Sequence, residues 1–273
     1  MATQTMADRP QAGELLRQWR ARRGKSQLGL SLDAGVSRRH ISFIEIGRSV
    51  PSRPMLIDLA AALDMPLRDR NTLLLAGGYA PIYPDNAWDG PEMRAITRAL
   101  QRMLRQHEPF PARVMDRYWN VVMTNEAAPR FFGRFCDLSA CPSPRNMLEL
   151  MFDPEGMRPS IADFPAVAES LIQRVHRESV GRVVDDRTKT LLATLHAFPD
   201  AEPPFVVADV QAPMPVIPLS FIHEDRGLNY FSMVTSVGTP RTVAAQELRI
   251  ECVFPADEET EALHAVLLSG GQA

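Results

Sequence analysis

The stretch AGVSRRHISFIEIGRSVPS, from Ala34 to Ser52, carries the strongest structural signal in this chain of 273 residues. It opens with the short turn Gly35-Val36-Ser37, whose serine is suited to cap a following helix. Ile41 and Ile44 lie three residues apart and therefore fall on one side of that helix. The stretch predicts a helix from Arg38 to Ile46 that follows a tight, glycine-containing turn.

Outside this stretch, similar serine, proline and glycine signals mark the ends of four more helices in the first 78 residues. The five helices are predicted at about 13–23, 27–34, 38–46, 54–63 and 66–76. The second and third helices flank the turn in the manner of a helix-turn-helix, whose second helix fits the major groove of DNA.

A turn-rich segment without an apolar period, 79–91, follows the helical part and is predicted to be a linker. An amphipathic helix is expected next, at 92–108. Beyond this helix the apolar residues alternate with a period of two, which indicates strands. A block of helical patterns follows, and the strand-like alternation then returns. Strands are predicted at 112–116, 119–123, 214–223, 228–237 and 248–254, and helices at 125–132, 145–152, 161–180, 186–198 and 257–268. This order is typical of an α+β domain with one mainly antiparallel sheet.

These patterns divide the chain into five parts. The predicted parts are a flexible N-terminus at 1–12, a helix-turn-helix DNA-binding domain at 13–78, the linker at 79–91, the α+β domain at 92–268 and a tail at 269–273. Residues 1–78 carry 12 Lys and Arg against 7 Asp and Glu, a net charge of +5, whereas the remainder carries −8. A basic segment is the expected footprint of phosphate binding, and an acidic domain is not expected on DNA. Chance segregation of charge is the alternative.

The composition, 45% hydrophobic and 23% charged, is that of a globular protein. No stretch approaches the roughly 18 apolar residues of a membrane helix, and the N-terminus lacks a signal-peptide pattern, so we expect a cytoplasmic protein without a membrane partner. Cys136, Cys141 and Cys252 are odd in number and unevenly spaced, which argues against disulfides and a metal site. The run at 223–225, His-Glu-Asp, cannot converge on one face of a strand, and no catalytic motif is present, so we expect no enzyme.

The predicted helix at 38–46 can read DNA through the face opposite Ile41 and Ile44. Arginine can grip a guanine with two parallel hydrogen bonds, and phenylalanine can contact a thymine methyl group. The residues predicted to contact bases are Arg38, Arg39 and Phe43. The residues predicted to contact phosphates, together with main-chain amides at the helix starts, are Gln27, Ser37, His40, Ser42, Arg48 and Arg53. The alternative is a surface turn whose arginines are merely solvated.

The segment KSQLGLSLDAGVSRRHISFIEIGRSVPSRPMLIDLAAALDMP, 25–66, resembles the DNA-binding domain of the XRE family, which has the lambda-repressor-like fold. The resemblance spans about 13–75 and implies an all-α five-helix domain that binds DNA sequence-specifically. It also implies a structural ion pair between Arg20 and Glu45. Phe43 stands where the family often has a polar side chain, so the resemblance does not predict the preferred base sequence.

Two later segments carry a second resemblance. RVMDRYWNVVMTNEAAPRFFG, 113–133, resembles the opening of a PAS-like domain. FSMVTSVGTPRTVAAQELRIECVFPADEET, 231–260, is similar to the closing part of the MmyB-like regulator ligand-binding domain. The resemblance covers about 93–267. It implies an α+β PAS-like domain that binds a small apolar ligand, such as a fatty acid or acyl derivative, with no other cofactor.

A small sheet closed by helices leaves a concave apolar interior. Its candidate lining residues, each of which can equally be plain core, are Trp119, Val121, Met123, Phe131, Phe132, Phe135, Met147, Met151, Phe152, Phe221, His223, Phe231 and Met233. The candidates for holding a polar head group are Arg117, Asn125 and His223.

These patterns together predict a sequence-specific transcription regulator that binds double-stranded DNA as a homodimer at a near-palindromic operator. A twofold dimer places its two reading helices about one DNA turn, roughly 34 Å, apart. In the alternative interpretation the C-terminal domain senses no ligand and serves dimerisation or partner docking. The sequence does not predict the identity of the ligand, the operator, or whether the protein activates or represses.

Overall fold

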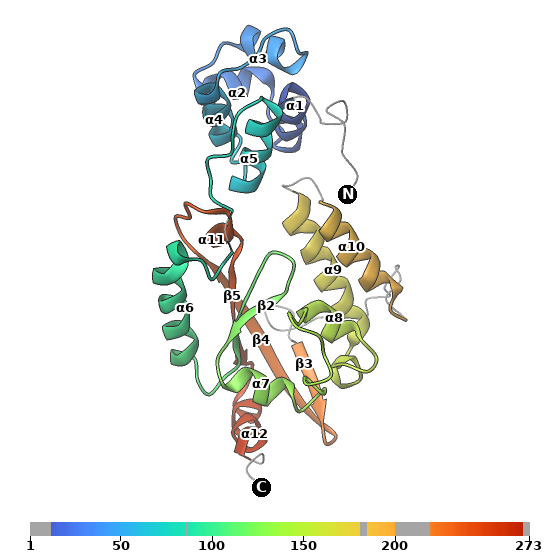
Figure 1. Cartoon of the computed structure of the whole chain (residues 1–273). Helices are drawn as coiled ribbons and strands as arrows, with labels where there is room; N and C mark the ends of the chain where they lie inside the picture. The colour runs from blue at the N-terminus through green and yellow to red at the C-terminus, as the bar shows by residue number, and fades with distance from the viewer. Residues whose placement is uncertain (1–11, 86, 181–184, 200–218, 270–273) are drawn as a thin grey trace. The chain divides into compact units, whose positions relative to one another are not determined.

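The computed structural model describes residues 12–85, 87–180, 185–199 and 219–269 (Figure 1). These residues form two compact units. The first unit contains the described residues up to position 85 together with two segments from later in the sequence, 177–180 and 240–246. The second unit contains the other described residues.

The first unit is built on five helices, as the sequence predicts. They are α1 (Ala12–Arg22), α2 (Gln27–Ala34), α3 (Arg38–Glu45), α4 (Arg53–Ala62) and α5 (Leu67–Ala76) (Figure 1). The side chains of Ser26, Ser37 and Ser52 each accept a hydrogen bond from the backbone three residues later, which satisfies an N–H group that the helix itself leaves unpaired. Gly35 ends α2 with a φ of 65°, a left-handed conformation that glycine adopts without steric cost.

The apolar core of the first unit packs α3 directly against α1. Trp19 on α1 and Ile41 and Ile44 on α3 are almost completely buried. Gly13 permits the close approach, because a Cβ atom at this position would lie 2.0 Å from the carbonyl oxygen of Ile44. Packing from its buried side therefore fixes the position of α3.

A buried ion pair adds a polar connection between the same two helices. Arg20 donates from Nε and Nη2 to the two carboxylate oxygens of Glu45, at 2.6 and 2.9 Å. Gln27 donates from Nε2 to the same carboxylate at 2.9 Å, which joins the start of α2 to the pair. Burial alone would raise the pKa of Glu45, but the hydrogen bonds from Arg20 and Gln27 outweigh burial and hold this pKa below its usual value. The carboxylate is therefore ionised at neutral pH.

Residues 79–85, the first half of the predicted linker, pack onto α5. Asn71 holds them through its side chain. Its Oδ1 accepts the N–H groups of Ile82 and Tyr83, each at 3.1 Å, and its Nδ2 donates to the carbonyl oxygen of Tyr83 at 2.7 Å. These residues therefore belong to the helical unit.

The sequence patterns did not predict a further short helix, α11 (Val243–Glu247). Most of it falls in the segment 240–246, which belongs to the first unit. The backbone N–H of Leu67 donates to Gln246 Oε1 at 2.6 Å. This bond supplies a cap for α5, since the N-cap residue of that helix is Pro66 and makes no side-chain hydrogen bond.

The second unit contains a five-stranded sheet with the strand order β2-β1-β5-β4-β3 (Figure 1). The strands are β1 (Ala112–Met115), β2 (Val121–Thr124), β3 (Leu219–His223), β4 (Arg226–Ser236) and β5 (Arg249–Pro255). Every neighbouring pair is antiparallel, so the predicted fold class is confirmed. All four residues of β1 are buried, because both faces of the sheet are covered at this strand.

Helices complete the second unit. They are α6 (Arg94–Gln106), α7 (Ala127–Phe132), α8 (Met147–Phe152), α9 (Phe164–Val180), α10 (Asp186–Ala197) and α12 (Glu258–Ser269), with single 3-10 turns at η2 (Pro91–Met93) and η3 (Arg158–Ser160). The last four residues of α9, 177–180, are those assigned to the first unit. The bounds of these α-helices lie within three residues of the predicted ones. The part of the third predicted strand at 214–218 lies outside the described residues.

The second predicted strand begins two residues later than expected. Trp119 lies in a turn with a φ of 68°, and β2 starts at Val121. Asp116 favours the turn, because its Oδ1 accepts the backbone N–H groups of Tyr118 and Asn120 at 2.8 and 3.0 Å. The prediction that Trp119 lies on this strand is therefore wrong.

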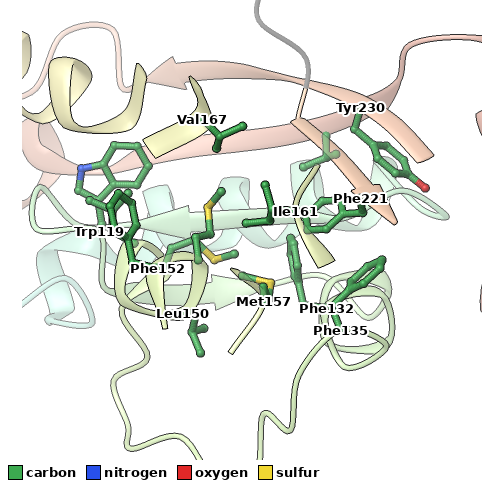
Figure 2. Packing of buried hydrophobic residues seen from close by; sticks show 14 of the residues in the cluster. Trp119, Phe132, Phe135, Leu150, Phe152, Met157, Ile161, Val167, Phe221 and Tyr230 are labelled. Atoms are coloured by element: carbon green, nitrogen blue, oxygen red, sulfur yellow. The ribbon is translucent and has the colours of Figure 1, made fainter. Parts of the chain in front are cut away.

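An aromatic cluster fills the core beside α7. The ring of Phe131 contacts those of Phe135, Phe221 and Tyr230 edge-on, with centroid distances of 5.1 to 5.5 Å. Figure 2 shows Phe135, Phe221 and Tyr230 in this cluster. Such edge-to-face contacts add to the stabilisation from apolar burial.

His264 of α12 is completely buried against this cluster. The ring nitrogen Nε2 donates to the carbonyl oxygen of Pro109 at 3.1 Å, and Nδ1 accepts from the hydroxyl of Tyr230 at 2.8 Å. Both nitrogens of a neutral imidazole are thus satisfied. Burial lowers the pKa of His264, against the opposing effect of the bond to Pro109.

Replacing Glu45 with glutamine should destabilise the first unit. The substitution keeps the shape but removes the charge from a side chain that is 2% exposed, so Arg20 loses its ionic partner. We expect Glu45→Gln to lower the free energy of unfolding by about 3 kcal/mol. Asp33→Asn breaks the exposed pair with Lys25 and should cost less than about 1 kcal/mol. Denaturant unfolding of the full chain measures both, and equally small losses would contradict the structural role of the buried pair.

The second unit should lose stability in mild acid because of His264. Its folded pKa is lowered, so below the unfolded value of about 6.5 the unfolded chain binds a proton that the folded chain does not. The loss is absent above that pH and grows as the pH falls below it. The melting temperature, measured from about pH 8 to about pH 5, should decline more steeply for the wild type than for His264→Gln. His176→Gln, at an exposed position, should keep the wild-type slope, and parallel curves for wild type and His264→Gln would contradict the prediction.

Candidate nucleic-acid interface and inner cavity

The outward face of α3 carries two arginines without polar partners. The side chains of Arg38 and Arg39 are exposed and make no hydrogen bond or ion pair with another described residue. The guanidinium carbon of Arg39 lies over the ring of Phe43, 5.2 Å from its centroid, and this stacking restrains the arginine. Ile41 and Ile44 hold the opposite side of the helix in the core. The helix therefore presents two cationic groups with unused hydrogen-bond donors to solvent.

Three of the residues predicted to contact phosphates have partners inside the protein. Ser37 Oγ accepts from the backbone of His40 at 3.2 Å, and His40 Nε2 lies 3.1 Å from Ser49 Oγ. Gln27 donates to Glu45, as described above. Ser37 and Gln27 each keep a further hydrogen that can be donated to a phosphate oxygen.

The other three predicted phosphate contacts are unengaged within the described residues. Arg48 and Arg53 are exposed and flank the turn between α3 and α4, and their side chains make no hydrogen bond or ion pair with a described residue. Ser42 is half-buried and makes no side-chain hydrogen bond with a described residue. Counting Arg38 and Arg39, four exposed arginines thus lie between positions 38 and 53.

The side chains predicted to line a ligand pocket fall into two groups. Most belong to the packed core of the second unit, namely Trp119, Phe131, Phe132, Phe135, Met147, Met151, Phe152 and Phe221. Figure 2 labels five of them, Trp119, Phe132, Phe135, Phe152 and Phe221. The others are less buried, namely Val121, Met123, His223, Phe231 and Met233, the last of which is 55% exposed. The apolar pattern of the sequence therefore identifies core residues more than it identifies a cavity.

A cavity of about 110 Å³ that is partly open to solvent nevertheless lies beside β1, β4, β5 and α9. Its lining residues are Arg113, Trp119, Met151, Val167, Ser170, Leu171, Arg174, Leu219, Ser232 and Glu251. Among the predicted pocket residues, Trp119 and Met151 line it. The cavity thus combines apolar walls with a charged end.

Arg113 and Glu251 form this charged end. They are direct partners in the β1–β5 register, so their side chains leave the sheet on the same face. Both side chains are 4% exposed, and Arg113 Nη2 forms an ion pair with Glu251 Oε2. Arg174 on α9 approaches from the other side, with Nη1 3.6 Å from Glu251 Oε1 and its guanidinium over the ring of Trp119. Burial alone would raise the pKa of Glu251, but the charges of Arg113 and Arg174 hold it below its usual value.

Two donor atoms of Arg113 remain unused. Its Nε and Nη1 atoms are buried and have no hydrogen-bond partner among the described residues. The guanidinium carbon lies 4.8 Å from the ring centroid of Phe132, which provides no conventional acceptor. Buried N–H groups without partners are costly, so these two atoms reduce the net contribution of the ion pair to stability.

The residues predicted to hold a polar head group do not line this cavity. Arg117 is engaged by Asp185 and Glu247, at 2.9 and 3.1 Å. Asn125 is buried and bonds three backbone groups through its side chain. His223 borders a different surface recess.

Sequence reasoning missed the charged end of the cavity. A signal exists, since Arg113 and Glu251 are charged residues inside strands whose other members are mainly apolar. Such a residue is ordinarily read as belonging to a solvated face, because alternation along a strand places polar groups toward water. The pairing of β1 with β5, which are far apart in the sequence, reveals the partnership.

The described residues were also searched for reactive cysteines, metal-binding clusters and membrane-spanning helices. Burial raises the pKa of Cys136 to about 11, so this thiol is protonated at neutral pH, and Cys141 and Cys252 are also free thiols. The described part of the chain contains no group of three or more His, Cys, Asp or Glu residues placed to hold a metal ion. Within 12–85, 87–180, 185–199 and 219–269, no helix has both the length and the apolar character needed to cross a bilayer.

Comparison with known protein families gives two matches. Residues 11–73 match a helix-turn-helix domain. Residues 96–267 match the MmyB-like transcription regulator ligand binding domain. A comparison with curated proteins gives no match.

Two solved structures resemble the chain to a limited extent. The restriction-modification controller protein C.AhdI from Aeromonas hydrophila is 33% identical over 23% of this chain and 97% of its own, with a TM-score of 0.22. An RNA-binding light-oxygen-voltage receptor is 11% identical over 97% of this chain and 63% of its own, with a TM-score of 0.31. Because both TM-scores are low, the assignment rests on the two family matches. The longer match spans more than half of the sequence, and the chain therefore belongs to the MmyB-like family of transcription regulators, with an XRE-like helix-turn-helix domain ahead of its ligand-binding domain.

Proposed function

We propose that this DNA-binding regulator acts in the cytoplasm as a homodimer on a specific, near-palindromic DNA site, and that its second domain senses a small apolar ligand. The observation that carries the DNA-reading part is the exposed pair Arg38 and Arg39 at the start of α3, which have no competing partner among the described residues. The proposal includes no catalysis, because both matched domains are regulator modules.

Base recognition depends on how firmly the two arginines are presented. Both side chains belong to a helix whose inner side is held in the core by the buried residues Ile41 and Ile44. The stack of Arg39 on Phe43 restricts the rotamers of the arginine before DNA arrives, which reduces the entropy lost on binding. In this arrangement Phe43 positions Arg39. Because Arg39 covers one face of the Phe43 ring, the edge of this ring is the part that can contact a thymine methyl group.

Sensing requires that the ligand bind two arrangements of the protein with different affinity. The connectivity of the sheet offers a route. Ser232 on β4 and Glu251 on β5 line the cavity beside β1, β4, β5 and α9. The loop between these strands carries the segment 240–246, which belongs to the first unit and caps α5 through Gln246. A ligand that shifts β4 against β5 therefore pulls on a segment bound to the DNA-reading unit.

The tight packing of the second unit favours a second candidate function, a dimerisation or docking module without a ligand. The cavity of about 110 Å³ is smaller than a cavity of roughly 150 Å³ that accommodates benzene. A fatty acid, the ligand implied by the family resemblance, would require the surrounding side chains to move.

Replacing both Arg38 and Arg39 with alanine should abolish selective DNA binding. Each two-bond contact between arginine and guanine contributes roughly 1–3 kcal/mol of discrimination, so the double variant should lose up to about 6 kcal/mol of preference. The operator is selected from a random library with the wild-type protein. Fluorescence anisotropy then gives Kd for this site and for random DNA, and circular dichroism verifies the fold.

Two variants serve as controls for this experiment. Arg102→Ala with Arg105→Ala removes the same charge from exposed positions on α6 and should leave the preference unchanged. Arg53→Ala should weaken binding to the selected site and to random DNA by the same factor. It should also reduce the slope of log Kd against log salt concentration by about one. An Arg38, Arg39 double variant that remains as selective as the wild type would refute the assignment of the reading face.

Native mass spectrometry of the full chain purified from its own cells should distinguish sensing from docking. Sensing predicts a dimer that carries a copurified small molecule, because a pocket that binds its ligand tightly retains it through purification. Docking predicts a dimer or partner complex without a small molecule. A strictly monomeric protein that still binds its operator selectively would contradict the proposed homodimer.

A further inference from the structure

We propose that one face of α6 binds phosphates of the same DNA that the first unit binds. This face carries Arg94, Arg98, Arg102 and Arg105, which together are named the α6 arginine stripe. The role of the stripe rests on DNA binding by the first unit and adds a phosphate-binding surface in the second. The expectation that an acidic domain stays off DNA considers only the net charge, which conceals this local concentration of positive charge.

Helical geometry brings the four arginines onto one side of α6. At 3.6 residues per turn, positions 94, 98, 102 and 105 fall within roughly a quarter of the helix circumference. The stripe is about 17 Å long, because each residue adds about 1.5 Å along the axis. Leu100 and Leu104 lie on another side of α6, where they are buried, and the helix contacts β1. The four arginines therefore lie on the solvent side of the helix.

No described residue neutralises the α6 arginine stripe. Its four side chains are exposed and make no hydrogen bond or ion pair with a described residue. The helix itself contains no aspartate or glutamate. Like charges four residues apart, such as Arg94 and Arg98, destabilise a helix. The stability of α6 therefore does not explain the arrangement, and an external anion does.

The phosphates of duplex DNA match the stripe in charge and in length. A duplex carries one negative charge per about 1.7 Å of its axis, so a length of about 17 Å offers about ten phosphates. Hydrogen bonds between a guanidinium and a phosphate are strong because both groups are charged. Only the residues 86–93 separate Asp85 of the first unit from Arg94. This short tether gives DNA bound by α3 a high effective concentration at α6.

Other anionic partners fit the stripe less well. A helix that binds a membrane surface inserts its apolar side into the bilayer, whereas Leu100 and Leu104 are buried in the second unit. A second copy of the chain offers the acidic first turn of α12, with Glu258, Glu259 and Glu261. Three carboxylates cannot neutralise four arginines, but the phosphates of DNA can. DNA is therefore the favoured partner.

The salt dependence of DNA binding tests the proposal. The stripe variant combines Arg94→Gln, Arg98→Gln, Arg102→Gln and Arg105→Gln, since glutamine is a good helix former. Fluorescence anisotropy gives Kd for a duplex of about 40 base pairs, roughly four turns, that contains the selected site. The slope of log Kd against log salt concentration should fall by about 3.6 for each bound protomer, because each lost phosphate contact removes about 0.9. From about 50 to about 200 mM salt, the wild-type affinity should therefore fall about a hundredfold more than that of the variant.

Matched double variants serve as controls. Arg94→Gln with Arg98→Gln should lower the slope by about 1.8, whereas Arg94→Lys with Arg98→Lys keeps two point charges and should retain the wild-type slope. Arg187→Gln with Arg226→Gln removes two exposed charges of the second unit outside α6 and should also retain it. In every variant the preference for the selected site over random DNA should be unchanged, because phosphates carry no sequence information.

The outcomes separate the stripe from the reading face of α3. A stripe variant that is folded by circular dichroism and has the wild-type slope overturns phosphate binding by α6, as does an equal loss of slope in the Arg187, Arg226 control. A changed assembly state in sedimentation velocity assigns the stripe to a second copy and overturns the proposal. Binding to phosphatidylglycerol vesicles that is lost in the stripe variant, with an unchanged slope on DNA, assigns it to a membrane and overturns it as well. A reduced slope in the stripe variant, beside an Arg38, Arg39 variant that stays selective, supports the stripe and refutes only the reading face.

Discussion

The ion pair between Arg20 and Glu45 is the contact on which the outward face of α3 depends. Two hydrogen bonds of 2.6 and 2.9 Å tie the end of α3 to α1, and Gln27 adds the start of α2 to the same carboxylate. The geometry leaves α3 little freedom to rotate, because Gly13 already brings the backbones of α1 and α3 into contact. With this side of the helix fixed by packing and charge, Arg38 and Arg39 can only face outward.

A second buried ion pair, between Arg113 and Glu251, has fewer of its hydrogen-bonding groups satisfied than the first. Arg113 and Glu251 occupy strands whose neighbours are mainly apolar, and each costs free energy to remove from water. Replacing a whole buried ion pair by apolar residues is often neutral or stabilising, so the burial of this pair is not itself an argument for stability. Arg113 also keeps donors that no described residue satisfies.

The organisation of the chain was largely predictable from the sequence. Serines at 26, 37 and 52 and the glycine at 35 act locally, so the ends of the first helices could be placed from neighbouring residues alone. Trp119 was misplaced because the carboxylate of Asp116 forms a turn that competes with the strand. The helix α11 was missed because its five residues are too few to show a period.

The sequence by itself determined the helix-turn-helix, the order of strands and helices, and the exposed position of Arg38 and Arg39, because capping, periodicity and turn chemistry depend on residues only a few positions apart. The tertiary structure alone decided which aromatic residues are simply packed core and which residues border a cavity. It also brought Arg113 opposite Glu251 and Gln246 onto the first turn of α5. These contacts join residues more than a hundred positions apart, and such pairing depends on strand register and chain topology, which no local pattern specifies.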